Sequence, residues 1–114
     1  MVPTIKLYQK IKAFLTAMVT NDPAIPPTAT SVDGIPVWTV DPNCEANDAI
    51  LAPELDGLSC EVIPGVKSGL CNVQVIADAK KGEGVNNIST VFVVDIEPLE
   101  ADRLDVTFDA PQPK

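Results

Sequence analysis

The sequence contains no histidine and has very few aromatic residues. Histidine is the most common general base and zinc ligand in proteins, so its absence excludes Ser-His-Asp and Cys-His nucleophilic sites within these 114 residues. Aromatic side chains make up only 4% of the chain and are scattered, so we expect no stacking platform for nucleic acid bases. The core must therefore consist mainly of aliphatic side chains, and an enzymatic role is not expected.

Basic residues are also scarce, and they are unevenly distributed. The chain has 8 lysines and arginines against 16 acidic residues, which gives a net charge of −8. The first 21 residues contain lysines but no acidic residue, whereas the remainder is strongly acidic. An acidic surface repels nucleic acid phosphates and anionic membranes, so neither is an expected partner. Two readings of this charge distribution stay open: the charge simply keeps the protein soluble, or the basic N-terminal segment docks onto an acidic partner.

Only three cysteines are present, at Cys44, Cys60 and Cys71. An odd number leaves at least one thiol unpaired, which suits a reducing compartment. Cys60 and Cys71 fall on successive expected strands, where they are either core-filling thiols or a cross-strand disulfide. The cysteine spacings match no zinc site, and we expect no metal and no cofactor. Segment 41–48 alternates side-chain oxygens as calcium loops do, but it lacks the glycine and the final acid, which favours a solvated acidic loop.

Seven short segments have the composition or the alternation of β-strands, with turn signals between them. The clearest alternation lies in 69–77, and the single tryptophan lies in 36–40 between Asp33-Gly34 and Asp41-Pro42. The segment 9–19 contains good helix formers, so a helix is the alternative there. The expected strands span residues 9–19, 36–40, 50–53, 59–63, 69–77, 89–96 and 103–109.

The alternation makes one face of each strand apolar, and two such faces must meet to leave water. This predicts an all-β Greek-key sandwich of about seven strands. We expect an extended arm at 1–8, the sandwich at 9–109 and a loose tail at 110–114. The residues expected in the core are Trp38, Val73, Val75, Phe92, Val94 and Val106.

Four stretches together resemble the bacterial immunoglobulin-like domains, and more narrowly the small stand-alone members encoded among phage and prophage structural genes. These stretches are 32–42 (VDGIPVWTVDP), 56–59 (DGLS), 69–79 (GLCNVQVIADA) and 82–85 (GEGV). The resemblance covers residues 9–108 and implies an immunoglobulin-like sandwich that is used for binding or display, often on virion surfaces.

The expected function is that of a non-enzymatic phage virion accessory protein, made in the host cytoplasm, that decorates or cements the capsid or tail. Its expected partner is the major capsid protein or a tail protein, and a homo-oligomer on the particle is left open. The alternative is a bacterial cell-surface adhesion or carbohydrate-binding module, which needs export. We expect no signal peptide, because the apolar stretch 13–19 is short and no clear cleavage site follows it. The residues expected to contact the partner are Ile5, Lys6, Leu7, Tyr8 and Lys10.

Overall fold

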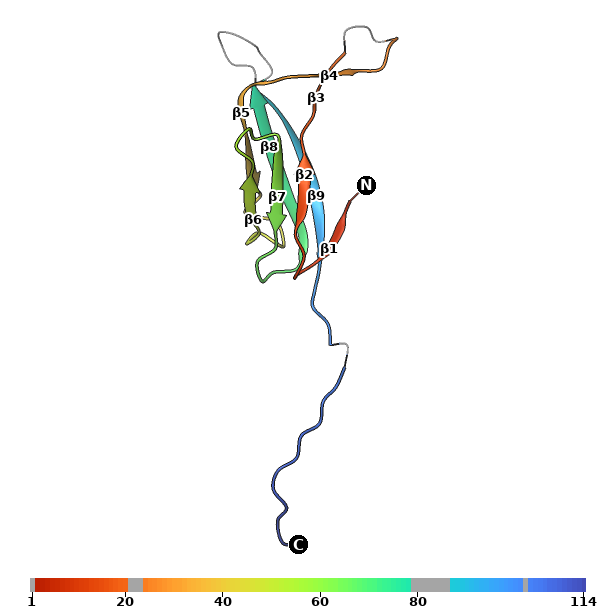
Figure 1. Cartoon of the computed structure of the whole chain (residues 1–114), viewed down its shortest axis with the longest axis vertical. Coiled ribbons are helices and arrows are strands. Elements are labelled where there is room, and N and C mark those ends of the chain that lie inside the picture. Colours follow the sequence, from red (N-terminus) through yellow and green to blue (C-terminus); the bar gives the residue numbers. More distant parts are fainter. Residues whose placement is uncertain (1, 21–23, 79–86, 102) are drawn as a thin grey trace.

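The computed structural model describes residues 2–20, 24–78, 87–101 and 103–114, and in these residues all regular structure is β-strand. The strands form one compact body, from which the C-terminal segment runs out as an extended chain (Figure 1). The nine strands are β1 (Thr4–Lys6), β2 (Ile11–Phe14), β3 (Ala17–Val19), β4 (Thr28–Thr30), β5 (Asp33–Val40), β6 (Ile50–Pro53), β7 (Ser59–Ile63), β8 (Gly69–Asp78) and β9 (Asn87–Glu97).

Two sheets face each other, and a hairpin projects from one end of them (Figure 1). The larger sheet has the order β1-β9-β8-β5, and the smaller has the order β2-β7-β6. All pairings are antiparallel except that of β1 with β9, which is parallel. The hairpin consists of β3 and β4. The arrangement is that of a sandwich, because residues of both sheets share one core.

The core lies between the two sheets and is mostly aliphatic. Alternate residues of β8 point inward, and Val62 and Cys60 face them from β7. Trp38 is part of this core, and its ring centroid lies 6.0 Å from that of Phe92 in an edge-to-face arrangement. Its indole N–H donates a 2.8 Å hydrogen bond to the carbonyl oxygen of Gly57, so the ring is fixed at both its apolar and its polar end.

Most of the expected strands are present in the structure. The segments 50–53 and 59–63 have the expected bounds, and the strands expected at 36–40, 69–77 and 89–96 are each longer at one or both ends. The segment 9–19 keeps its alternation but divides into β2 and β3 around Leu15 and Thr16. Residues 21–23 of the expected connection and 80–86 of the expected loop lie outside the described residues. Of the expected core residues, Trp38, Val73, Val75 and Val94 are buried, and Phe92 is partly buried against them.

The expected final strand at 103–109 is wrong, and so is the place of Val106 in the core. The described residues after Glu97 form no strand, and Val106 is 76% exposed, with Leu104 and Phe108 about nine-tenths exposed. The physical reason is that alternation alone does not make a strand, which also needs a sheet edge to pair with. Pro98 directly follows β9, and the segment then leads away from both sheets and extends the molecule to 85 Å (Figure 1).

The N-terminal residues also differ from expectation, because they are not a free arm. Thr4–Lys6 pairs with Asp95–Glu97 of β9, in a register that sets Ile5 opposite Ile96. Both side chains then point between the sheets, and Ile5 is only 7% exposed. Ile5 is therefore a core residue rather than a partner contact, and the first strand of the body begins at Thr4.

Candidate functional site

The three cysteines are free thiols, and two of them are buried in the core. Burial raises the pKa of Cys60. The pKa of Cys71 is raised to about 11, chiefly by burial and to a smaller extent by the nearby Cys44. Since the thiolate is the nucleophile, both buried thiols are unreactive at neutral pH. Cys60 lies on β7 and Cys71 on β8, in opposite sheets, and both fill space in the core.

Segment 41–48 uses its side-chain oxygens to hold neighbouring backbone. The Asp48 carboxylate accepts hydrogen bonds from the amides of Val66 and Lys67, and Glu45 accepts one from Leu70 at the start of β8. These contacts fix the loop against the entry to β8. In the described part of the chain, no three His, Cys, Asp or Glu side chains are grouped to hold a metal ion. None of the described segments is a helix long and apolar enough to cross a membrane.

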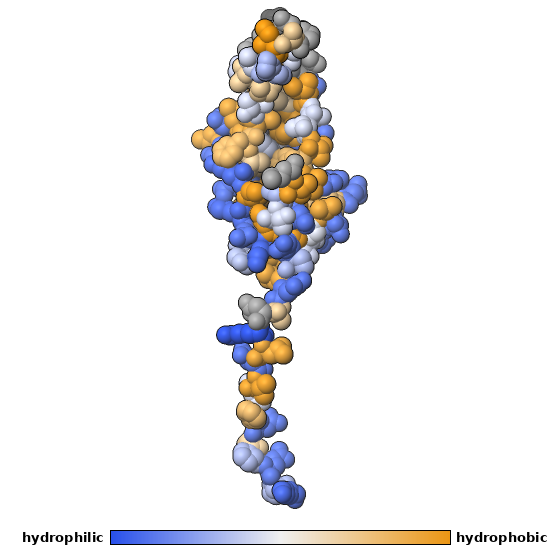
Figure 2. Space-filling model, turned by 90° about the vertical axis from the view of Figure 1, so that its right-hand side faces the viewer, coloured by the Kyte–Doolittle hydropathy of each residue, from blue (hydrophilic) through white to orange (hydrophobic). Residues whose placement is uncertain are grey.

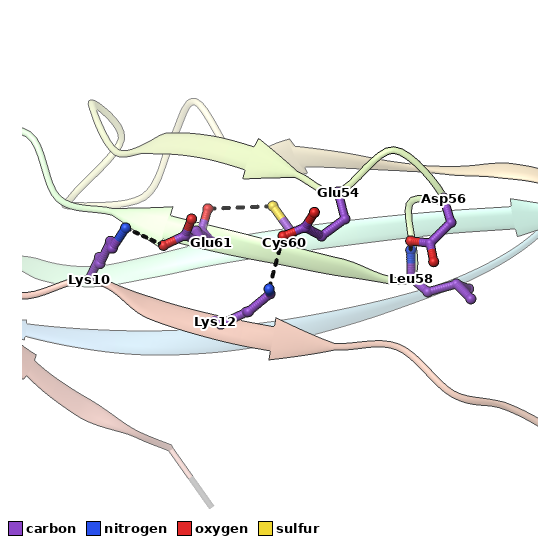
Figure 3. Close-up of polar contacts among 7 residues, drawn as sticks. All are labelled: Lys10, Lys12, Glu54, Asp56, Leu58, Cys60 and Glu61. Atoms are coloured by element: carbon purple, nitrogen blue, oxygen red, sulfur yellow. Dashed lines mark hydrogen bonds and ion pairs between the residues drawn. The ribbon is translucent and has the colours of Figure 1, made fainter.

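The outer face of the smaller sheet contains two lysine–carboxylate pairs between neighbouring segments (Figure 3). Lys10 contacts Glu61 at 2.6 Å, and Lys12 contacts Glu54 at 2.9 Å. The hydrogen bond from Lys10 lowers the pKa of Glu61, and the hydrogen bond to Glu54 raises the pKa of Lys12. Lys10, an expected partner contact, is thus paired within its own chain, so its charge is already matched.

A hollow of about 570 Å³ lies at the end of the body from which the C-terminal segment leaves. Lys6 and the exposed Tyr8 line it from the chain that follows Pro3, and Glu97 and Leu99 line it from the end of β9 onward. Leu7, by contrast, packs against the core. Of the five residues expected to contact a partner, Lys6 and Tyr8 therefore line one hollow. Lys10 does not line it, although its side chain is 61% exposed.

An apolar groove of about 270 Å³ opens at the opposite end of the body, between the segment Leu15–Met18 and the beginning of β9. It exists because β1 pairs with β9 only along Asp95–Glu97. Among the described residues, no strand pairs with the remaining stretch of β9 on that side. Val75 and Ala77, at the end of β8, are buried side chains that line this groove. The groove is therefore the open end of the core, next to a free sheet edge.

The C-terminal segment Arg103–Asp109, which we call the arm, presents its apolar side chains to solvent. Figure 2 shows apolar and polar residues following one another along it. Leu104, Val106 and Phe108 alternate with polar residues, and none packs against the body. The sequence pattern revealed these residues but not their exposure. The groove was missed altogether, because it depends on the break between β2 and β3 and on the shortness of β1.

Comparison with known proteins gives no family model, no curated protein and no solved structure that matches the chain. Three features of the described surface are the candidates for a binding function. They are the hollow beside Tyr8, the apolar groove beside Ile88 and the arm.

Proposed function

We propose that this chain is a non-enzymatic accessory protein of a phage virion, an immunoglobulin-like domain that decorates or cements the capsid or tail. The strand order supports the fold in this proposal. In this proposal we assign β2-β7-β6 to strands B, E and D of an immunoglobulin-like sandwich, and β9-β8-β5 to strands G, F and C. The chain changes sheet from β5 to β6 and again from β7 to β8, as Greek-key connections do.

The resemblance of the tryptophan strand and of the alternating segment 69–79 to phage immunoglobulin-like domains supports the setting. These segments contain β5 and β8 of the larger sheet, and the two strands pair with each other along Val37–Val40. Val40 and Trp38 are thereby opposite Val73 and Val75, so the resemblance falls on residues that build the core.

The observation that favours attachment to a larger assembly is the exposed arm. Burying a large aliphatic or aromatic side chain is worth about 1.5–3 kcal/mol, and Leu104, Val106 and Phe108 leave this unused in the isolated chain. An extended segment with alternating apolar residues is suited to pair with the sheet edge of a neighbouring protein. The arm thus takes the place of the N-terminal arm expected from the sequence, and Lys6 and Tyr8 add contacts where it leaves the body.

Mass spectrometry of particles purified from a host that carries the gene tests this function. We expect the full chain to be found on the particles, and a chain that ends at residue 102 to be lost from them. A chain that ends at 109 is the matched control, because it removes only the last five residues, and we expect it to be retained. Absence of the full chain from the particles, or equal occupancy by the 1–102 chain, would contradict the proposal.

A further inference from the structure

The free edge of β9 is an incomplete part of the larger sheet. On one side β9 pairs with β8 from Asn87 to Ile96, whereas on the other side β1 covers only Asp95–Glu97. In the described part of the chain, the eight residues Asn87–Val94 therefore have a strand on one side only. Unpaired backbone groups along such an edge are a template for a further strand.

The groove beside this edge is apolar and opens toward the place where the further strand would lie. A cavity of ~150 Å³ lined by aliphatic side chains holds a benzene molecule, so a groove of about 270 Å³ can accept a phenyl ring together with an aliphatic side chain. Its walls come from the larger sheet and from the segment that joins β2 to the hairpin, and they include Val75, Ala77, Ile88, Thr90, Leu15 and Ala17.

The arm matches this site in length and in pattern. It has seven residues, against eight in the unpaired stretch of β9. When extended at ~3.3 Å per residue, these seven residues span about 23 Å. Leu104, Val106 and Phe108 would share the face that meets the groove, and Asp105 and Thr107 would face solvent. One sequence therefore contains both a free sheet edge and an alternating segment that can pair with such an edge.

We propose that the arm of one copy adds as a strand to the free edge of β9 in a second copy and fills its groove. The inference rests on the proposed function, since it names the partner of the same attachment segment. The arm leaves the body where β9 ends, whereas the groove lies where β9 begins (Figure 1). An arm that returned to its own groove would have to pass around β1 within residues 98–102, whereas copies stacked head to tail need no such reversal. A head-to-tail contact of this kind is open-ended and builds chains of copies.

Two measurements on purified protein test the proposal. Sedimentation over a concentration series should show the full chain forming dimers and longer species, while the 1–102 chain stays monomeric. A fluorescently labelled peptide of residues 103–109 should bind the 1–102 chain, and the Val106→Asp peptide should bind at least tenfold more weakly, because an acid cannot enter the apolar groove. Ile88→Lys at the lip of the groove should also weaken binding at least tenfold. Val91→Lys is the matched control. Val91 lies on the opposite face of β9 and is 60% exposed, compared with 50% for Ile88, so the Val91→Lys chain should bind the peptide as tightly as the parent chain does.

Each other outcome overturns the proposal in a distinct way. A monomeric full chain with a peptide that still binds the 1–102 chain would mean that the arm docks in its own groove. Oligomers that persist in the 1–102 chain would mean that another surface joins the copies. The absence of both oligomers and peptide binding would exclude the site. A full chain that is present on particles but does not self-associate would overturn this inference and leave the proposed function standing, and self-association without particle occupancy would do the reverse.

Discussion

Replacing Trp38 by phenylalanine separates the polar and apolar contributions of the single tryptophan to the fold. The substitution keeps an aromatic ring against Phe92 but removes the indole N–H that lies 2.8 Å from the carbonyl oxygen of Gly57. A buried acceptor that loses its donor costs about 1–3 kcal/mol. The lost ring volume adds roughly 1 kcal/mol more at ~24 cal/mol per Å³ of unfilled space. We therefore expect the free energy of unfolding to fall by about 2–4 kcal/mol.

Urea unfolding followed by circular dichroism measures this loss, since the variant has no tryptophan fluorescence. Trp38→Ala should cost more, about 3–5 kcal/mol, and bring the domain close to the limit of its stability. Val37→Thr, on the exposed face of the same strand, is the control and should change stability by no more than about 0.5 kcal/mol. A loss below about 0.5 kcal/mol for Trp38→Phe would refute the reasoning, because the indole would then not be a buried donor.

Three further predictions concern other parts of the body. Gly57 has a φ of +69°, and an added Cβ would lie 2.8 Å from Cδ of Pro36. Gly57→Ala should therefore lower the free energy of unfolding, measured in urea, by about 1–3 kcal/mol. Unchanged stability would contradict the turn geometry. Lys10 lowers the pKa of Glu61 below 4.5, so the pair stabilises the fold above pH 4.5, and this contribution is lost as the pH falls below that value. Glu61→Gln should therefore flatten the decline of Tm below pH 4.5. Parallel curves of Tm against pH for the variant and the parent would argue against the pair. Cys71, with its pKa near 11, should resist iodoacetamide at pH 8 in the native protein and react in urea; rapid native alkylation would show that the core is open.

The sequence predicts those parts of the fold whose signal is local. The alternation in 69–77 reflects a strand buried on one face, and the observed strand β8 has that burial pattern. The turn residues Asp56 and Gly57 correctly separate β6 from β7, because a positive φ favours glycine at that point. In these places, the local preference and the tertiary structure agree.

Prediction from the sequence fails where the presence of a neighbouring strand decides whether a segment becomes a strand. β1 has only three residues, too few for a pattern, and Ile5 is buried because β9 happens to pass beside it. The arm has a better strand pattern than β1 but pairs with no strand of its own chain among the described residues. For the same reason, the apolar residues of the candidate site could be recognised from the sequence, but neither their exposure nor the groove could.

Hydrogen–deuterium exchange along the arm tests the central claim, that Arg103–Asp109 is an attachment strand, most directly. The backbone amides of 103–109 should exchange without protection in dilute free protein, because no strand pairs with them there. They should become protected when the protein is bound to the particle, while the amides of 110–114 stay unprotected. Equal, unprotected exchange of 103–109 in both states would contradict the claim.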